Sequence, residues 1–421
     1  PILAFVGIYL TIGLTAMPWR KIPLAMKILW QGQDEKKEQK GDISPFQALM
    51  TELAATVGTG NIVGVATAIY FGGPGAIFWM WIIALFGMAT KYSEAVLAVT
   101  YREKDKNGNY VGGPMYYIKN GLNKHWRWMA GLFAFFGMFA AFGIGNMVQS
   151  NSVADEMFTT FKIPFWLTGI TMSICVSVVI IGGVKSIAKV ASKLIPFMAI
   201  TYVLAALFIV LINFEKMPGV VTLIIDSAFN GAAASGGFLG ASVWMAIRMG
   251  FARGIFSNEA GLGSAPIAHA AAKTSNPVNQ GMIAMLGVFI DTIIICSLTA
   301  FVILLTGAFE SGHEGASMTS LAFSTALYGY GGYIVSFGLI LFAFTTILGW
   351  SYYGERCASY LFGIRIIFIY RIFWIIAIFT GAIIKLEIVW IFADIANGLM
   401  ALPNLIALLL LSPIIFIKTK D

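Results

Sequence analysis

The sequence predicts an all-α polytopic membrane protein with eleven transmembrane helices, and three observations support this fold class. The chain of 421 residues is 58% hydrophobic and only 11% charged, whereas soluble domains carry about 25% charged residues. Apolar segments of about 20 residues, long enough to cross a bilayer, recur along the whole chain. The segments do not alternate with a period of two residues, which argues against a membrane β-barrel.

The expected spans are joined by tight turns and by polar connections. The longer polar connections are expected at residues 19–42, 101–127, 215–237 and 309–333. The eleven apolar spans are expected at residues 1–18, 45–71, 76–100, 128–149, 164–181, 195–214, 238–272, 278–306, 334–362, 366–384 and 388–417.

The net charge of +7 comes from lysines and arginines in the connections, so it does not indicate a nucleic-acid partner. Most of them follow the odd-numbered spans, while the connections on the other side hold only Lys162, Lys216 and Lys385. Positive charge collects on the cytoplasmic side of membrane proteins. We therefore expect a multi-pass protein of the cell membrane with its N-terminus outside and its C-terminus in the cytoplasm.

The second span is interrupted at its centre by Gly58, Thr59, Gly60 and Asn61. Unwound backbone inside a membrane is tolerated where it lines a cavity or is buried in protein, and it is typical of transporter binding sites. A half-helix that ends near Val57 presents free carbonyls to a cation, and one that begins near Gly60 presents free amides to a carboxylate. The alternative is a glycine-lined contact between two helices. This stretch alone leaves both interpretations open.

A second interruption, Gly261-Leu262-Gly263-Ser264, falls in the seventh span. The broken spans are five positions apart in the series, so the two broken helices enter the membrane from opposite sides. The arrangement predicts one transport domain over residues 1–421, built from inverted five-helix repeats at 45–214 and 238–417, with 1–18 as an extra N-terminal helix. Inverted repeats with discontinuous helices are typical of secondary transporters.

Three segments resemble the alanine or glycine:cation symporter family. They are the tryptophan-rich stretch GGPGAIFWMWIIALFG at 72–87, TVGTGNIVGVA at 56–66 and SNEAGLGSAPIAHA at 257–270. The resemblance covers most of the chain. It implies a leucine-transporter-type fold, two discontinuous helices, and sodium-coupled import of alanine or glycine by alternating access. A proton-coupled transporter and, less favoured, a channel remain alternatives. An enzyme is not expected, because the sequence has neither an HExxH motif nor a nucleophile elbow.

The first break is also similar to the first broken helix of the neurotransmitter:sodium symporters, and this resemblance implies a sodium site. The ligands would be the carbonyls of Ala54, Val57 and Phe342 and the hydroxyls of Thr345 and Thr346. The last three residues have i, i+3, i+4 spacing, which puts them on one helix face. Back-bonding of the two hydroxyls to their own helix is the alternative.

Asn61 matches a side-chain ligand of a second sodium site in the same relatives. Nothing else in the sequence requires a second ion. No organic cofactor is expected.

Substrate contacts are expected at both breaks and on two neighbouring spans. The amides of Thr59 and Gly60 would bind the carboxylate of a small amino acid, and bulky rings would limit its side chain. The alternatives are interhelical hydrogen bonding for Gln149, helix capping for Asn258 and simple packing for Trp350. The predicted substrate-binding residues are Thr56, Gly58, Thr59, Gly60, Gln149, Phe256, Asn258 and Trp350.

Charged residues at membrane depth are functional candidates by default. Lys91 and Glu94 are expected to pair with each other, and His269 is expected to be a plain helix residue. Besides the substrate, the expected partner is the lipid bilayer. The sequence is compatible with a monomer and leaves the oligomeric state open. The remaining charged candidates, as gates or structural ion pairs, are Glu52, Arg248, Arg253, Glu259 and Asp291.

Overall fold

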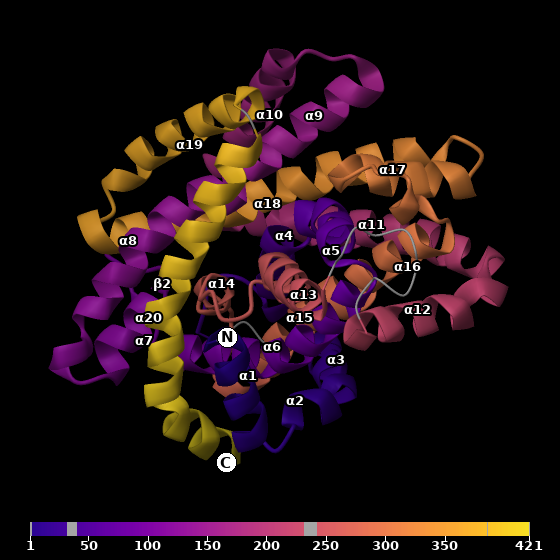
Figure 1. Cartoon of the computed structure of the whole chain (residues 1–421). Helices are drawn as coiled ribbons and strands as arrows, with labels where there is room; N and C mark the ends of the chain where they lie inside the picture. The colour runs from indigo at the N-terminus through magenta and orange to yellow at the C-terminus, as the bar shows by residue number, and fades with distance from the viewer. Residues whose placement is uncertain (1, 32–39, 231–241, 385, 421) are drawn as a thin grey trace.

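The computed structural model describes residues 2–31, 40–230, 242–384 and 386–420. These residues are almost all helical (Figure 1). The strands among them form one antiparallel hairpin of β1 (Glu103–Lys104) and β2 (Tyr110–Val111). Figure 1 shows the C-terminal helix α20 (yellow) running along one side of the molecule.

The first half of the chain contains the first broken helix and the long helix α6. Its helices, with η marking 3-10 and π segments, are α1 (Ile2–Gly13), α2 (Met17–Arg20), α3 (Ile22–Gln31), α4 (Pro45–Thr56), η1 (Gly60–Gly64), α5 (Val65–Gly72), α6 (Gly75–Thr100), α7 (Pro114–Gly121), η2 (Lys124–Trp126), α8 (Trp128–Phe142), η3 (Gly143–Met147), α9 (Val148–Phe161), α10 (Phe165–Ile180), α11 (Gly183–Ile212), η4 (Phe214–Lys216) and α12 (Met217–Asn230).

The second half contains the second interruption and the longest helices. Its helices are α13 (Val243–Asn258), α14 (Ala265–His269), α15 (Pro277–Val288), η6 (Phe289–Cys296), α16 (Ser297–Leu305), η7 (Ala308–Glu310), α17 (Gly315–Ala326), α18 (Gly331–Phe362), α19 (Ile366–Ile383) and α20 (Leu386–Lys420). The predicted boundary at 238 lies outside the described residues.

The first predicted break is confirmed. Helix α4 begins with a capping box, in which the Ser44 hydroxyl accepts from the Gln47 N–H and the Gln47 side chain accepts from the Ser44 N–H. It ends where Val57 becomes extended, with φ −76° and ψ 92°. The helix resumes as η1 and α5 after a bend of 53°. The two glycines beside Thr59 therefore do interrupt an apolar span.

The second predicted break is also confirmed. Helix α13 ends at Asn258, and Glu259, Gly261 and Gly263 then all have left-handed φ angles, of 57°, 87° and 80°. A Cβ atom on residue 263 would lie 2.6 Å from Pro114, so glycine is required there by space as well as by φ. The short helix α14 follows. The interruption of α13–α14 thus depends on backbone conformations that interior helix residues rarely adopt.

Seven described helices are long and apolar enough to cross a membrane, and the bent α4–α5 pair makes eight. The further predicted spans at α1, α10 and α13–α14 are helical but shorter. The exact count of eleven and the inverted-repeat layout therefore remain predictions.

Four connections contain more structure than expected. The structure places α2 and α3 in 19–42, the hairpin, α7 and η2 in 101–127, α12 in 215–237, and η7 and α17 in 309–333. In addition, α9 continues the fourth span through residues expected to be a polar connection. These segments are too polar or too short to show up as apolar spans.

Helix α6 lies at the centre of the packing and contacts α1, α13 and α15. From Gly87 to Val99 every one of its residues is buried, including Lys91 and Glu94. Because this helix packs against the segments on both sides of the second break, its charged side chains reach the broken region. Helix α18 contacts α4, α8 and α9, so it packs against the first half of the first broken helix.

Candidate binding site at the two helix breaks

The backbone of the first break is held by side chains rather than by helical hydrogen bonds. The N–H of Gly58 donates to Asn61 Oδ1 at 2.9 Å, and the N–H of Thr59 donates to Gln149 Oε1 at 3.3 Å. Gln149 in turn donates through Nε2 to the Ile144 carbonyl in the π-helical segment η3. The structure therefore brings Gln149 to the Thr59 amide, where the sequence predicts the substrate carboxylate.

Two of the predicted sodium ligands, the Val57 carbonyl and the Thr346 hydroxyl, are in contact at this break. The Thr346 hydroxyl donates to the Val57 carbonyl at 3.4 Å, and a Cβ on residue 58 would lie 2.4 Å from Thr346 Oγ1. Ala54 and Phe342 are completely buried on the same two helices. A carbonyl, a hydroxyl and tight burial suit a monovalent cation, so the residues present fit the predicted ion.

Thr345 behaves differently. Its hydroxyl lies within 3.1 Å of Leu341 O and 3.0 Å of Phe342 O in its own helix, and 3.7 Å from the sulfur of Met198. This is the back-bonding that the sequence left open as the alternative. Thr56 shows the same pattern, because its hydroxyl donates to the Glu52 carbonyl at 3.2 Å.

The two breaks touch each other at Gly60. A Cβ on this residue would lie 3.0 Å from the Cα of Ser257 and 3.2 Å from its hydroxyl. The predicted substrate residues of the first break are all buried, from Thr56 at 3% exposed to Thr59 at zero. The close approach explains why residue 60 has no side chain.

Asn258 caps the end of α13 and also reaches another helix. Its Oδ1 accepts from the Ala260 N–H at 3.0 Å, and its Nδ2 donates to the Thr292 hydroxyl at 3.1 Å. Capping, the structural alternative, therefore accounts for the Asn258 oxygen.

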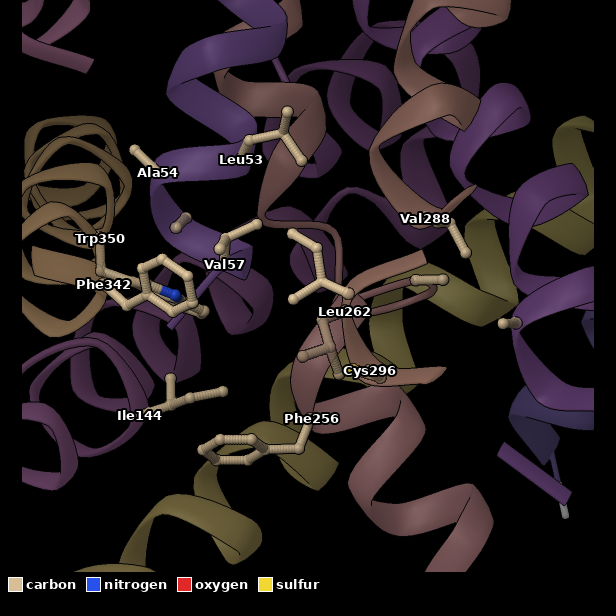
Figure 2. Close-up of a cluster of buried hydrophobic side chains, with 14 of the residues drawn as sticks. Leu53, Ala54, Val57, Ile144, Phe256, Leu262, Val288, Cys296, Phe342 and Trp350 are labelled. Carbon is tan, nitrogen blue, oxygen red and sulfur yellow. The ribbon is translucent and has the colours of Figure 1, made fainter. Parts of the chain in front are cut away.

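Two bulky rings predicted to limit the substrate are also buried. Phe256 is 6% exposed and Trp350 is 1% exposed. Figure 2 shows the two rings apart from each other in the buried cluster, with Trp350 on the side of Phe342 and Phe256 beyond Ile144. The Trp350 indole donates to Glu259 Oε1 at 2.7 Å.

Asp291 has a central position that the sequence did not reveal. Its carboxylate accepts from Asn61 Nδ2 at 2.6 Å, from Ser257 Oγ at 2.9 and 3.0 Å, and from Thr292 Oγ1 at 2.7 Å. The carboxylate is completely buried and lies on the π-helical segment η6. It thus joins η6 to both breaks. The only sequence signal was an acidic residue at membrane depth.

A second buried polar cluster corrects the predicted pairing of Lys91. Its ammonium lies 3.3 Å from Glu52, not beside Glu94 as expected from their spacing. His269 Nε2 lies 2.6 Å from the other Glu52 oxygen, and His269 Nδ1 lies 2.6 Å from Gln280 Nε2. His269 is therefore not a plain helix residue, since it links α14 to α4.

Glu94 instead organises the second break. Its carboxylate accepts from the Gly263 N–H at 3.1 Å and from Asn404 Nδ2 at 2.6 Å. Asn404 also donates to the Gly261 carbonyl at 2.9 Å. The remaining charged candidates lie nearer the surface, with Arg248 exposed and Arg253 within 3.5 Å of Asp394.

A cavity of about 640 Å³ lies at the predicted extracellular end of the molecule. Arg253 and Asp394 line it together with Asp155 and Glu314. Its lining comes from η1, α5, α9, α13, α17 and α20 and the residue before α17. The cavity therefore borders α5 and α13, which flank the two breaks.

Solved structures of transporters share this arrangement. MhsT in complex with L-phenylalanine has a TM-score of 0.57 at 13% identity, over 91% of this chain and 99% of that chain. An Eremococcus coleocola manganese transporter mutant has a TM-score of 0.54 at 12% identity, over 89% of this chain and 78% of that chain. At such identities the likeness shows the fold alone. That fold is the leucine-transporter-type fold, in a chain with several apolar helices long enough to span a membrane.

The chain belongs to the sodium:alanine symporter family, whose model matches residues 1–421. It is 51% identical to the sodium/alanine symporter AgcS of Methanococcus maripaludis over 98% of this chain and 91% of that protein. It is 54% identical to an uncharacterized transporter of Haemophilus influenzae, over 100% of this chain and 92% of that protein. A Bacillus subtilis relative, "Probable sodium/glutamine symporter GlnT", is 42% identical over 99% of this chain and 85% of that protein. The protein is thus a transporter and not an enzyme.

Proposed function

We propose that this protein is a sodium-coupled symporter that imports alanine and glycine by alternating access. The observation that carries the proposal is the first break. Within three residues the Val57 carbonyl meets the Thr346 hydroxyl and the Thr59 amide meets Gln149. The carbonyl and hydroxyl suit a sodium ion, and the amide and the Gln149 side chain suit the carboxylate of a zwitterionic amino acid. Family membership supports sodium as the coupling ion.

The primary sodium site is formed by the carbonyls of Ala54, Val57 and Phe342 with the hydroxyl of Thr346. The Thr345 hydroxyl joins these ligands when its side chain rotates away from the carbonyls of its own helix. Because the ligands come from α4 and α18, sodium binds when these two helices are together. The ion thereby favours the conformation in which the substrate site is complete.

A second cation binds next to Asn61. The support is Asp291, whose buried carboxylate contacts the Asn61 amide. A buried carboxylate in a membrane is costly unless a positive charge or a proton neutralises it. The completely buried carboxylates of Glu52, Glu94 and Asp291 and the nearly buried Glu259 outnumber the Lys91 ammonium, so a second sodium ion improves the charge balance.

The substrate carboxylate binds the amides of Thr59 and Gly60 and the Gln149 side chain, with Thr56, Gly58 and Asn258 around it. Phe256 and Trp350 close the space for the side chain. Close packing then selects alanine and glycine, because each added methylene strains a packed pocket by about 1–3 kcal/mol.

The membrane arrangement follows the predicted pattern of eleven spans, with the N-terminus outside and the C-terminus in the cytoplasm. In this orientation α4 enters from the cytoplasm and the acidic cavity beside Arg253 opens outward. The cavity then offers a route for sodium and alanine toward the breaks.

Proton coupling is the second candidate, and one contact favours it. His269 lies between Glu52 and Gln280 at 2.6 Å from each. Histidine acts as a proton shuttle in proteins, and the oxygen of a rotated Gln280 amide would accept a hydrogen bond from Nδ1–H. The ring then joins Glu52 to Gln280 through both of its nitrogens, which is the arrangement that a proton relay needs.

Radiolabelled alanine uptake into proteoliposomes tests these candidates. We expect concentrative, saturable uptake driven by an inward sodium gradient and abolished when potassium replaces sodium. Uptake driven by a pH gradient alone would instead establish proton coupling. Uptake that does not saturate would indicate a channel.

A further inference from the structure

Glu259 occupies an unusual backbone position at the second break. It ends α13 with φ 57°, and its N–H donates to the Ile255 carbonyl at 2.8 Å. Helices commonly end on a left-handed residue, but that residue is usually glycine because a side chain is strained there. A glutamate at this position therefore indicates that contacts of its side chain offset the backbone strain.

The Glu259 carboxylate is 1% exposed and uses both oxygens. Oε2 accepts from the Ser264 hydroxyl at 2.5 Å, within the same break. Oε1 accepts from the Trp350 indole at 2.7 Å, across the interface to α18. The hydrogen bond to Trp350 therefore connects the second broken helix to α18.

Trp350 is held from three directions. A Cβ on Gly145 would lie 2.1 Å from the Trp350 Cβ, so the backbone of η3 presses on the base of the side chain. Tyr353 meets the indole edge-on, with ring centroids 5.6 Å apart. Indole has a single N–H donor, so the bond to Glu259 decides which way the ring faces.

We propose that Glu259 is a positioning residue that sets the size limit of the substrate by fixing the Trp350 indole. The inference rests on the proposed function, in which Trp350 walls the side-chain pocket. With the bond intact, the ring is unable to turn away from an incoming side chain. Without it, the ring rotates and the pocket accepts larger amino acids.

The test measures competition against labelled alanine, in sodium, for purified wild type and variants. Glycine, alanine, valine and leucine compete. In Glu259→Ala we expect the affinity for leucine relative to alanine to rise by roughly tenfold, the effect of one such hydrogen bond. Glu259→Gln keeps an acceptor oxygen and should restore the wild-type ranking. Ser264→Ala is the matched control, because it removes the other Glu259 contact and leaves the Trp350 bond.

A double-mutant cycle separates positioning from general damage. Trp350→Phe keeps a ring but has no N–H, so Glu259→Ala should cause no further change in ranking in that background. An unchanged ranking in Glu259→Ala, or additive effects in the cycle, overturns the proposal. If Glu259→Ala does not fold, an unchanged ranking in Trp350→Phe overturns it as well. Failure of wild type to bind alanine would instead contradict the proposed function.

Discussion

At the residue scale, three glycines of the first broken helix differ in what a side chain would meet. A Cβ at Gly60 would lie 3.0 Å from Ser257, and a Cβ at Gly58 would lie 2.4 Å from the Thr346 hydroxyl, whereas Gly64 has no neighbour within 4 Å of such an atom. The three positions therefore provide their own internal control.

Gly60→Leu should abolish alanine binding, because the added side chain would fill the approach to the Thr59 and Gly60 amides and push against Ser257. Gly58→Ala should weaken binding by displacing Thr346. Gly64→Ala should bind normally. Equilibrium binding of labelled alanine to purified protein measures all three. Normal affinity in a folded Gly60→Leu protein would show that these amides do not bind the carboxylate.

Thr346→Ala should raise the sodium concentration needed for half-maximal alanine binding by roughly tenfold, the order expected for a lost ligand group. Thr345→Ala should have the smaller effect, because its hydroxyl bonds to Leu341 and Phe342 in its own helix. Alanine binding titrated with sodium is the measurement. If the double variant keeps the wild-type sodium dependence, sodium binds elsewhere.

At the element scale, both helix breaks could be predicted because glycine and polar residues stand out inside apolar spans. Helix α17 could not, since its mixed sequence is stabilised by packing against its chain neighbours α16 and α18 and against the distant segment η1, and hydropathy does not mark these contacts. The π-helical geometry of η1, η3 and η6 could not be predicted either, because their glycine and polar residues do not indicate which hydrogen-bond spacing a helix adopts. The place of Asp291 was missed because its partners Asn61 and Ser257 come from two other elements.

The predicted cytoplasmic ends of the two broken helices are tied together. Ile43, just before α4, forms a parallel bridge with Ala272, just after α14. Arg102 donates to the carbonyls of both segments, at 3.0 Å to Lys40 and at 2.6 Å to Thr274, and to those of Ala270 and Ala272. Burial lowers the pKa of the Arg102 guanidinium, but arginine stays charged in proteins. We call this arrangement the cytoplasmic clasp.

Arg102→Ala should open the clasp, because four carbonyls lose a charged donor at about 1.5–3 kcal/mol each. The reporter is Thr274→Cys in a Cys175→Ser background, labelled by an impermeant maleimide in inside-out vesicles. Labelling should accelerate by roughly tenfold or more. Lys106→Ala, at an exposed site in the same connection, is the control. Equal labelling rates with and without Arg102 would show that it does not hold this side closed.

At the scale of the whole molecule, the proposed sodium and alanine sites share the first break, so we expect binding of each to affect the other. Linkage requires that sodium raises the alanine affinity by the same factor as alanine raises the sodium affinity. The broken helix supplies the physical path, because the Val57 carbonyl and the Thr59 amide are two residues apart. An ion that orders one carbonyl also orders the neighbouring amides.

The number of coupled sodium ions can be tested through Asp291. If a second cation binds beside Asn61, alanine binding should depend on sodium with a Hill slope above one in wild type and close to one in Asp291→Asn, which loses the negative charge that holds the cation and keeps the shape. Thr292→Val is the matched control, because it removes one donor to the Asp291 carboxylate and leaves the charge. It should keep the steeper slope. Titrating alanine binding with sodium in all three proteins gives the slopes directly. A folded Asp291→Asn protein with the wild-type slope would mean that the buried carboxylate is neutralised by Lys91 and protons rather than by sodium, and that a single ion bound at Val57 and Thr346 drives transport.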